Sequence, residues 1–229
     1  MDIREIVFDT ETTGLSFKDG HKVIEIGALE LINRMPTGVS YHQYINPERE
    51  IEQSAIRIHG ITNESVEHEP RFAEIADDFL EFIAGSALVA HNAPFDMGFL
   101  NHELKHIGYP ELTNKVIDTL IIARKQFPGA RVSLDSLCQR FDVDSTARTF
   151  HGALLDSELL ADVYLELTGG RQPDMMGVNK FATTNQSSDT TTLQMPTNKE
   201  KREPRPFPAT EEEIVAHQDF IRNIEHNIW

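Results

Sequence analysis

Residues 4–14 read Arg-Glu-Ile-Val-Phe-Asp-Thr-Glu-Thr-Thr-Gly, and this stretch decides how the rest of the chain is interpreted. Its apolar part, through Phe8, predicts a short buried β-strand. Two acids, Asp9 and Glu11, follow at the end of that strand. Because side chains alternate along a strand, both carboxylates should lie on the same face.

Two carboxylates this close repel each other unless they are protonated or share a cation. Oxygen ligands from Asp and Glu suit Mg²⁺ or Mn²⁺ better than zinc. A solvated strand end is the alternative interpretation of the Asp9 and Glu11 pair taken alone. Structural Ca²⁺ binding is a further idea, but the acids lack the clustered loop spacing of a calcium-binding hand.

Outward from this stretch, the hydrophobic pattern predicts a series of strands and helices. Strands are expected at 22–31 and 41–45, forming an antiparallel meander with the first strand, and at 87–90 and 116–118. Helices are expected at 72–83, from Pro94 to just before Gly108, and at 120–125, 133–141 and 152–167.

Three more candidate residues lie at the predicted helix starts. Asp96 falls just inside a helix that follows a buried strand, where polar side chains commonly face a cleft, although a simple helix N-terminal charge is the alternative. His151 and Asp156 are separated by four residues at the start of the last helix. Asp156 is expected to project toward the strand acids, and His151, on a less regular stretch, to reach water.

Together, these motifs resemble the DEDDh exonuclease superfamily, and within it the family of proofreading epsilon subunits of bacterial DNA polymerase III. The likeness covers about residues 3–170 and rests mainly on residues 8–14, 91–96 and 151–156, with 59–61 and 116–119 as lesser landmarks. It implies an α/β, ribonuclease H-like fold, in which helices flank a mixed central sheet.

The resemblance also implies a mechanism. It gives the metal ligands as Asp9, Glu11, Asp96 and Asp156, holding two divalent ions, Mg²⁺ or Mn²⁺. His151 would be the general base that takes the proton from the attacking water. The implied reaction removes a terminal, mispaired nucleotide from a single-stranded or frayed DNA 3′ end. Asp118 is expected to support the site rather than to act in it.

The family likeness further implies contacts to the terminal nucleotide. Glu11, Gly14, His59 and Asp156 are the implied contacts, and glycine at position 14 would allow a close backbone approach. The family pattern has an acid five positions before this histidine, whereas this chain has Ser54 there. Ser54 is therefore a further candidate contact.

The chain changes character after residue 170. Residues 1–170 are predicted to form the exonuclease domain and 171–209, polar and proline-containing, a flexible linker. Residues 210–229 begin with a Thr-x-x-Glu capping box and predict a short helix. Its apolar stripe consists of Ile214, Ile221, Ile224 and Ile228.

This flexible tail, ending in a short helix, resembles the epsilon segment that docks on the polymerase catalytic subunit. A helix folding back on its own domain is the alternative. Gln172 and Met175 resemble a segment that binds the sliding clamp, but Gly177 stands where an aromatic residue is expected. A plain linker is the alternative interpretation there.

Composition limits the other possibilities. The formal net charge is −16, and residues 1–170 contain 14 Lys or Arg against 28 Asp or Glu, a net −14. This charge argues against DNA binding by a broad basic surface, but bound cations at the site and a tethered partner protein could supply the missing affinity. One cysteine, Cys138, excludes an internal disulfide, and it is expected to be buried. No signal peptide or spanning run is apparent, which predicts a cytoplasmic protein without membrane contact. The family resemblance implies that the protein is bacterial.

Two rival functions remain open from the sequence. A freestanding DEDDh ribonuclease or oligoribonuclease that trims RNA 3′ ends would share every catalytic residue, but would not need the tail. A non-catalytic subunit that stabilises the polymerase is the second rival. The presence of all five catalytic positions argues against it.

Overall fold

The computed structural model describes residues 2–146, 148 and 150–169. Of the two units into which the chain divides, residues 1–178 and 179–229, only the first contains described residues. The predicted linker at 171–209, with Gln172 and Met175, and the predicted helix at 210–229, with its isoleucine stripe, lie outside the described residues.

The described residues form a mixed five-stranded sheet in the order β3-β2-β1-β4-β5. Its strands are β1 (Arg4–Thr12), β2 (Val23–Ile32), β3 (Met35–Tyr44), β4 (Ala87–Ala90) and β5 (Val116–Asp118). β1, β2 and β3 pair antiparallel, which confirms the predicted meander, whereas β4 pairs parallel with both β1 and β5. The central strand β1 is therefore hydrogen-bonded to a neighbouring strand along each edge, β2 on one side and β4 on the other.

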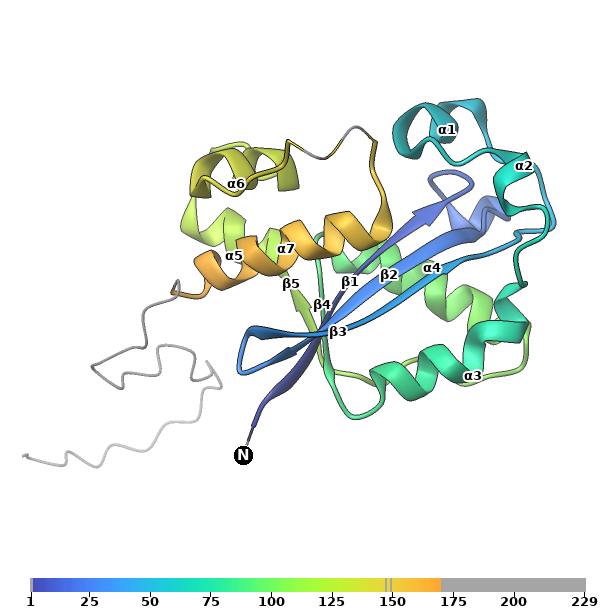
Figure 1. Cartoon of the computed structure of the whole chain (residues 1–229), viewed down its shortest axis with the longest axis horizontal. Helices are drawn as coiled ribbons and strands as arrows, with labels where there is room; N and C mark the ends of the chain where they lie inside the picture. Colours follow the sequence, from blue (N-terminus) through green and yellow to red (C-terminus); the bar gives the residue numbers. More distant parts are fainter. Residues whose placement is uncertain (1, 147, 149, 170–229) are drawn as a thin grey trace, which may run out of the picture. The chain divides into compact units, whose positions relative to one another are not determined.

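The helices cover both faces of this sheet (Figure 1). Ile6 and Phe8 of β1 pack with buried residues of α3 (Phe72–Ile83) and α4 (Ala93–His106). Val7 faces the other way, into a cluster with Leu160 and Tyr164 of α7 (Ala153–Leu167). Since side chains alternate, Asp9 and Glu11 belong to the α7 face.

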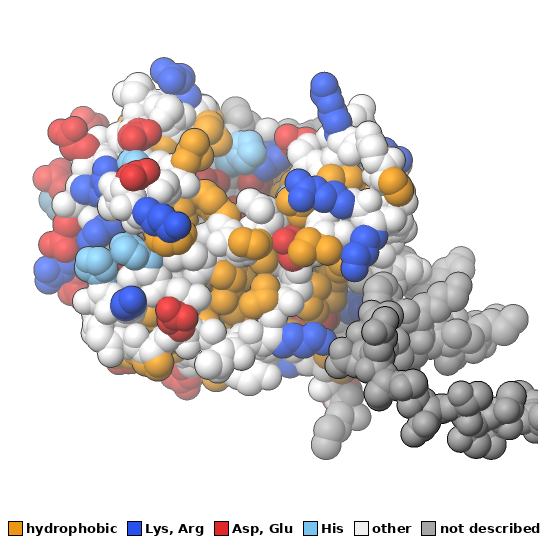
Figure 2. Space-filling view, turned by 180° about the vertical axis from the view of Figure 1, so that it is seen from behind, with side chains coloured by type: hydrophobic (Ala, Val, Ile, Leu, Met, Phe, Trp, Pro, Cys, Tyr) orange, Lys and Arg blue, Asp and Glu red, His pale blue; other side chains and the backbone are white. Residues whose placement is uncertain are grey.

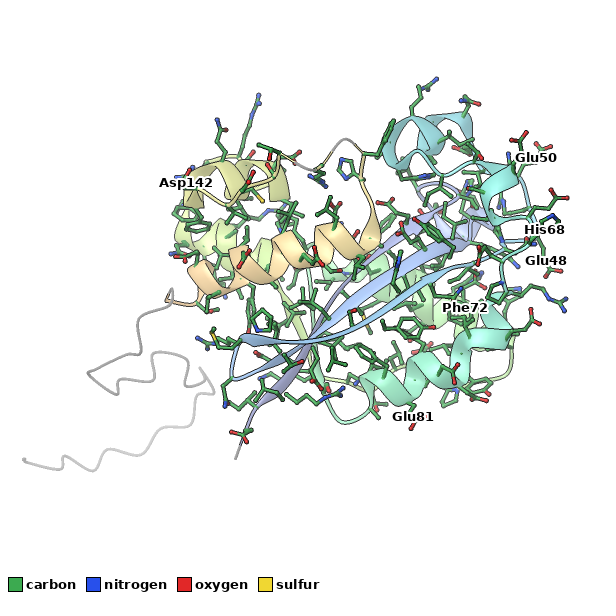
Figure 3. The ribbon with its side chains drawn as sticks, viewed as in Figure 1. Glu48, Glu50, His68, Phe72, Glu81 and Asp142 are labelled. Atoms are coloured by element: carbon green, nitrogen blue, oxygen red, sulfur yellow. The ribbon has the colours of Figure 1, made fainter. Side chains whose placement is uncertain are left out.

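Two shorter helices, α5 (Thr119–Gln126) and α6 (Leu134–Phe141), pack against α7 and bury Cys138, as expected. On the opposite face, α3 follows its predicted amphipathic pattern. Phe72 points from α3 toward the sheet, whereas Glu81 on the same helix points outward (Figure 3).

Two predicted strand boundaries were wrong. β1 extends to Thr12, so Asp9 and Glu11 lie within the strand and pair with Gly27 and Glu25 of β2. β3 begins at Met35 rather than position 41, although its first six residues are exposed and lack an alternating pattern. A two-residue turn with positive φ at both Asn33 and Arg34 sets this hairpin, so backbone pairing rather than burial extends the strand.

The sequence interpretation missed three short elements. They are η1 (Phe17–Asp19), α1 (Gln53–His59) and α2 (Asn63–Val66). Only two residues of α1, Ala55 and His59, are buried, so its sequence has almost no periodic pattern of apolar residues. The four residues of α2 begin with a capping box at Thr62 and bury one side chain, Val66, which is too little to produce a periodic pattern.

Acidic and basic side chains both occur on the face seen in Figure 2, and hydrophobic side chains gather near its middle. No helix in the described part of the chain is both long and apolar enough to cross a membrane.

Candidate active site

The start of α7 lies directly on β2, and Gly27 makes this possible. A Cβ at Gly27 would lie 2.1 Å from the backbone nitrogen of Leu154. Ser157 Oγ donates to the Gly27 carbonyl at 2.8 Å, and the backbone N–H of Ala153 donates to Glu25 Oε2 at 3.0 Å. These contacts fix the first turn of α7, which carries the predicted site residue Asp156 above the β1 acids.

Asp96 reaches the site from α4. It is 2% exposed, and its Oδ1 accepts hydrogen bonds from Thr10 Oγ1 at 2.7 Å and from the Thr10 backbone N–H at 3.2 Å. Thr10 lies between Asp9 and Glu11 in sequence, so these bonds fix Asp96 to the strand that carries both acids.

The connection before α4 has an unusual backbone conformation. Asn92 has φ 72° and ψ 48°, a left-handed conformation that asparagine tolerates better than most residues. Its backbone N–H donates to Asp118 Oδ1 at 3.1 Å, and the same oxygen caps α5 through Leu120 N–H at 2.9 Å. Asp118 thus has the supporting position that the sequence predicted.

The acids perturb one another strongly. Burial, followed by repulsion from Asp96 and Glu11, holds the pKa of Asp9 well above its ordinary value. Burial and the neighbouring Asp156 and Glu25 raise the pKa of Glu11 to about 8. Burial raises the pKa of Asp96 to about 7. The cluster therefore resists carrying all of its negative charges without a cation.

The donor atoms fit a hard divalent cation. Ligand atoms of Glu11, His151 and Asp156 all lie within 4.8 Å of one another. Asp156 is 3% exposed, and its buried Oδ1 has no hydrogen-bond partner among the described residues. Oxygen ligands with unshared lone pairs in a buried acidic cluster match Mg²⁺ or Mn²⁺ chemistry.

His151 lies at the solvent edge of this cluster. Its side chain is 44% exposed, and its Nδ1 is 3.3 Å from Asp156 Oδ2. The backbone N–H of His151 donates to the Ile58 carbonyl at 3.2 Å, which ties the residue to α1. The imidazole thus lies beside the Asp156 carboxylate and is partly exposed to solvent.

A cavity of about 180 Å³ opens beside Glu11. Its lining includes Gly14, Ser54 and His59, so the structure brings together three candidate contacts from separate parts of the sequence. Asp156, the remaining candidate contact, is next to Glu11 but is not part of this lining. The apolar part of the lining is Leu15, Ala55, Ile58 and Phe95.

Local contacts explain the protonation state of one lining residue, His59, and the identity of another, Gly14. Nδ1 of His59 accepts from the Ile61 backbone N–H at 3.0 Å, so in neutral His59 the proton is on Nε2. Burial lowers the pKa of His59, which favours this neutral form. A Cβ at Gly14 would lie 2.4 Å from Cε1 of His21, so packing against His21 already requires glycine there.

The sequence interpretation missed Arg148. Its side chain is 7% exposed, and its Nη2 donates to Asp156 Oδ2 at 2.5 Å and lies 2.7 Å from His151 Nδ1. Nη1 pairs with Asp135 of α6. One signal was available: Arg148 is the only Lys or Arg in residues 141–170, a stretch that also contains His151 and Asp156.

Comparison with known proteins agrees with this geometry. The sequence model of the RNase_T exonuclease family matches residues 6–164. The DNA polymerase III subunit epsilon of Rickettsia felis is 49% identical over 227 residues and covers 97% of each chain. The same subunit of Escherichia coli K12 is 44% identical over 223 residues, 94% of this chain and 90% of that one.

Solved structures show the same architecture. Exonuclease X in complex with 5′ overhanging duplex DNA is 27% identical, with a TM-score of 0.55 over 72% of this chain and 90% of that one. The nuclease domain of 3′hExo, a DEDDh family member bound to rAMP, shares the fold at 18% identity and a TM-score of 0.62, over 73% and 92% of the two chains. The chain therefore belongs to the DEDDh exonuclease family, within the DNA polymerase III epsilon subunits, and has the ribonuclease H-like fold predicted from its sequence.

Proposed function

We propose that this chain is the proofreading 3′→5′ exonuclease of a replicative DNA polymerase, removing mispaired nucleotides from a single-stranded or frayed DNA 3′ end. The observation that carries the proposal is the convergence of four acids and a solvent-facing histidine beside a small cavity. The epsilon relatives, which match almost the whole chain, support the link to a polymerase and to the bacterial cytoplasm where that polymerase works.

Asp9, Glu11, Asp96 and Asp156 are the proposed metal ligands. Two bound Mg²⁺ or Mn²⁺ ions would neutralise phosphate charge and make a bound water more acidic. The residues contribute the geometry: Thr10 holds Asp96, and the first turn of α7 holds Asp156. The raised pKa values of Asp9, Glu11 and Asp96 support this role, because a cation relieves their repulsion.

His151 is the proposed general base. One nitrogen of the neutral ring accepts the proton of the attacking water, and the exposure of the side chain lets the proton pass on to solvent. Its tie to Ile58 keeps the ring next to the α1 wall of the cavity. The base and the substrate end are thereby positioned by the same helix.

The terminal nucleotide is proposed to enter the cavity. At about 180 Å³ it is smaller than the ~300 Å³ of typical small-molecule sites, so it suits part of one nucleotide. Glu11 and the Nε2–H of His59 offer an acceptor and a donor for the sugar, and Gly14 and Ser54 border the same space. Asp156, next to Glu11, is proposed to face the same terminal nucleotide.

The tail is proposed to bind the partners. The isoleucine stripe in residues 210–229 would dock on the polymerase catalytic subunit, and Gln172 and Met175 would contact the sliding clamp. The net charge of −14 on residues 1–170 supports this, because such a body has little attraction of its own for DNA. Tethering would raise the local DNA concentration instead.

Matched oligonucleotides test the activity. A 5′-labelled DNA strand with a mispaired 3′ end should lose mononucleotides one at a time in Mg²⁺, and Asp9→Asn should abolish the reaction. If wild-type protein released nothing, the enzyme assignment would be wrong. Faster trimming of the matched RNA strand, with no binding to a polymerase subunit, would instead favour the ribonuclease alternative.

A further inference from the structure

Arg148 places a buried positive charge inside the acid cluster. Its guanidinium is almost completely covered, and three of its neighbours are Asp135, His151 and Asp156. A guanidinium keeps its charge at any ordinary pH, so its loss of hydration must be offset by nearby acids. Asp156 supplies one such acid from within the cluster, and Asp135 supplies another from α6.

Arg148 occupies the atoms that the proposed reaction needs. Its Nη2 bonds Asp156 Oδ2 at 2.5 Å, and the same nitrogen lies 2.7 Å from His151 Nδ1. Arginine has no acceptor, so Nδ1 of His151 must accept this bond with a lone pair. One proposed metal ligand and one nitrogen of the proposed base are thus engaged by the same guanidinium.

The attachment of Arg148 to the cluster is incomplete. Its buried Nε has no hydrogen-bond partner within the described residues, whereas Nη1 is held by Asp135, whose side chain is 67% exposed. Asp135 lies outside the group of acids around β1, at the first turn of α6. Asp135 therefore helps to hold Arg148 beside Asp156, from an exposed position on the neighbouring helix.

We infer that Arg148 is a positioning residue that competes with divalent cations for Asp156 and holds His151 until a cation displaces it. This inference rests on the proposed function of the site. A cation binding to Asp156 would repel the guanidinium and free Nδ1 of His151 in the same step. Arg148 would thereby couple metal binding to the availability of the base.

Calorimetric titration with Mn²⁺ alone tests the competition. Arg148→Ala should bind Mn²⁺ about tenfold more tightly than wild type, because the competing charge is gone. In EDTA the variant should unfold at a lower temperature, since the acids lose their counter-charge, and Mn²⁺ should raise its Tm more than it raises that of wild type. Arg131→Ala, which removes the same charge from an exposed position, should match wild type in both measurements.

A second variant covers the case in which Arg148→Ala does not fold. Asp135→Asn leaves Arg148 in place but weakens its anchor, and should tighten Mn²⁺ binding by about two- to threefold. Equal or weaker Mn²⁺ binding in the folded Arg148 variant, or unchanged binding in Asp135→Asn, would overturn the inference alone. Failure of wild type to bind Mn²⁺ would instead count against the proposed function.

Discussion

At the scale of single residues, the site is a set of carboxylates held where ionisation is unfavourable. Glu11 shows this most clearly, because burial and the neighbouring Asp156 raise its pKa from 4.5 to about 8. Grouping the acids lowers the free energy of unfolding, and a bound cation would restore it. Function, rather than folding, therefore explains why the acids are grouped.

The unfavourable ionisation of Glu11 should appear in the pH dependence of stability. The folded-state pKa of Glu11 lies above the unfolded value, so the folded protein holds a proton that the unfolded chain releases between pH 4.5 and about 8. In EDTA, the free energy of unfolding should fall as pH rises through that window. Glu11→Gln should flatten the slope and be more stable than wild type near pH 8.5 by up to about 4 kcal/mol, since each pKa unit corresponds to about 1.4 kcal/mol.

Urea unfolding at several pH values, with EDTA or with Mn²⁺, measures this slope. Saturating Mn²⁺ should remove most of it from wild type, because the metal replaces the proton. A wild-type slope of opposite sign in EDTA would contradict the assignment of Glu11 as a strained carboxyl group.

His151 should separate the chemical step from metal binding. His151→Ala should lower kcat by about 10²–10⁴, the usual contribution of a general base. The four carboxylates remain, so the Mn²⁺ affinity measured by calorimetry should stay close to that of wild type. A large loss of affinity would show that His151 acts as a metal ligand, a role its position near Glu11 and Asp156 would also allow.

At the scale of elements, the site depends on how closely α7 approaches β2. Gly27 faces the backbone of Ala153 and Leu154, and any side chain there would push away the first turn of α7. Asp156 lies in that turn, so its distance from the β1 acids is set by a glycine on a different strand. Glu25 and Ser157 complete the attachment with hydrogen bonds.

A matched pair of glycine substitutions tests this dependence. Gly27→Ala should cost about 3 kcal/mol, the upper end for overpacking, because the clash is with backbone atoms, and should weaken Mn²⁺ binding through the shift of Asp156. Gly152→Ala adds the same methyl group at the α7 N-cap, where no atom lies within 4 Å and φ is −138°. It should cost less than about 1 kcal/mol in urea unfolding. Equal costs for the two variants would contradict the packing argument.

At the scale of the whole molecule, the proposed function gives the acidic body and the tail complementary roles. The body contains the chemistry but has little electrostatic attraction for DNA, so the proposed partner must bring the DNA end to it. The tail would then govern where the enzyme acts rather than what it does.

Removing residues 171–229 should therefore leave hydrolysis of free oligonucleotides nearly unchanged and abolish binding to the polymerase subunit. Ile221→Asp should have the same effect on binding, because it places a charge in the apolar stripe. Asn223→Asp adds the same charge on the opposite side of an ideal helix and should bind normally in a pull-down with the purified subunit. Equal loss in both variants would argue against a stripe-specific contact.

The sequence by itself determined the class of fold and the five central candidates. Long apolar periods predicted α3, α4 and α7 within one or two residues, because each buries a continuous face. The alternation along β1 placed Asp9 and Glu11 on one face without any knowledge of the rest of the molecule. The ordered motifs then supplied Asp96, His151 and Asp156 through the family resemblance.

Only the tertiary structure decided what surrounds these residues. The family resemblance named Ser54 and His59 as candidate contacts, but helix α1, which carries them, buries too few residues to produce a hydrophobic period in the sequence, so neither the helix nor the cavity was predicted. Arg148 was missed because a single arginine in a connecting segment predicts nothing until α6 and α7 place acids around it. Local patterns record which face of an element is buried, whereas contacts between distant elements exist only once those elements have packed.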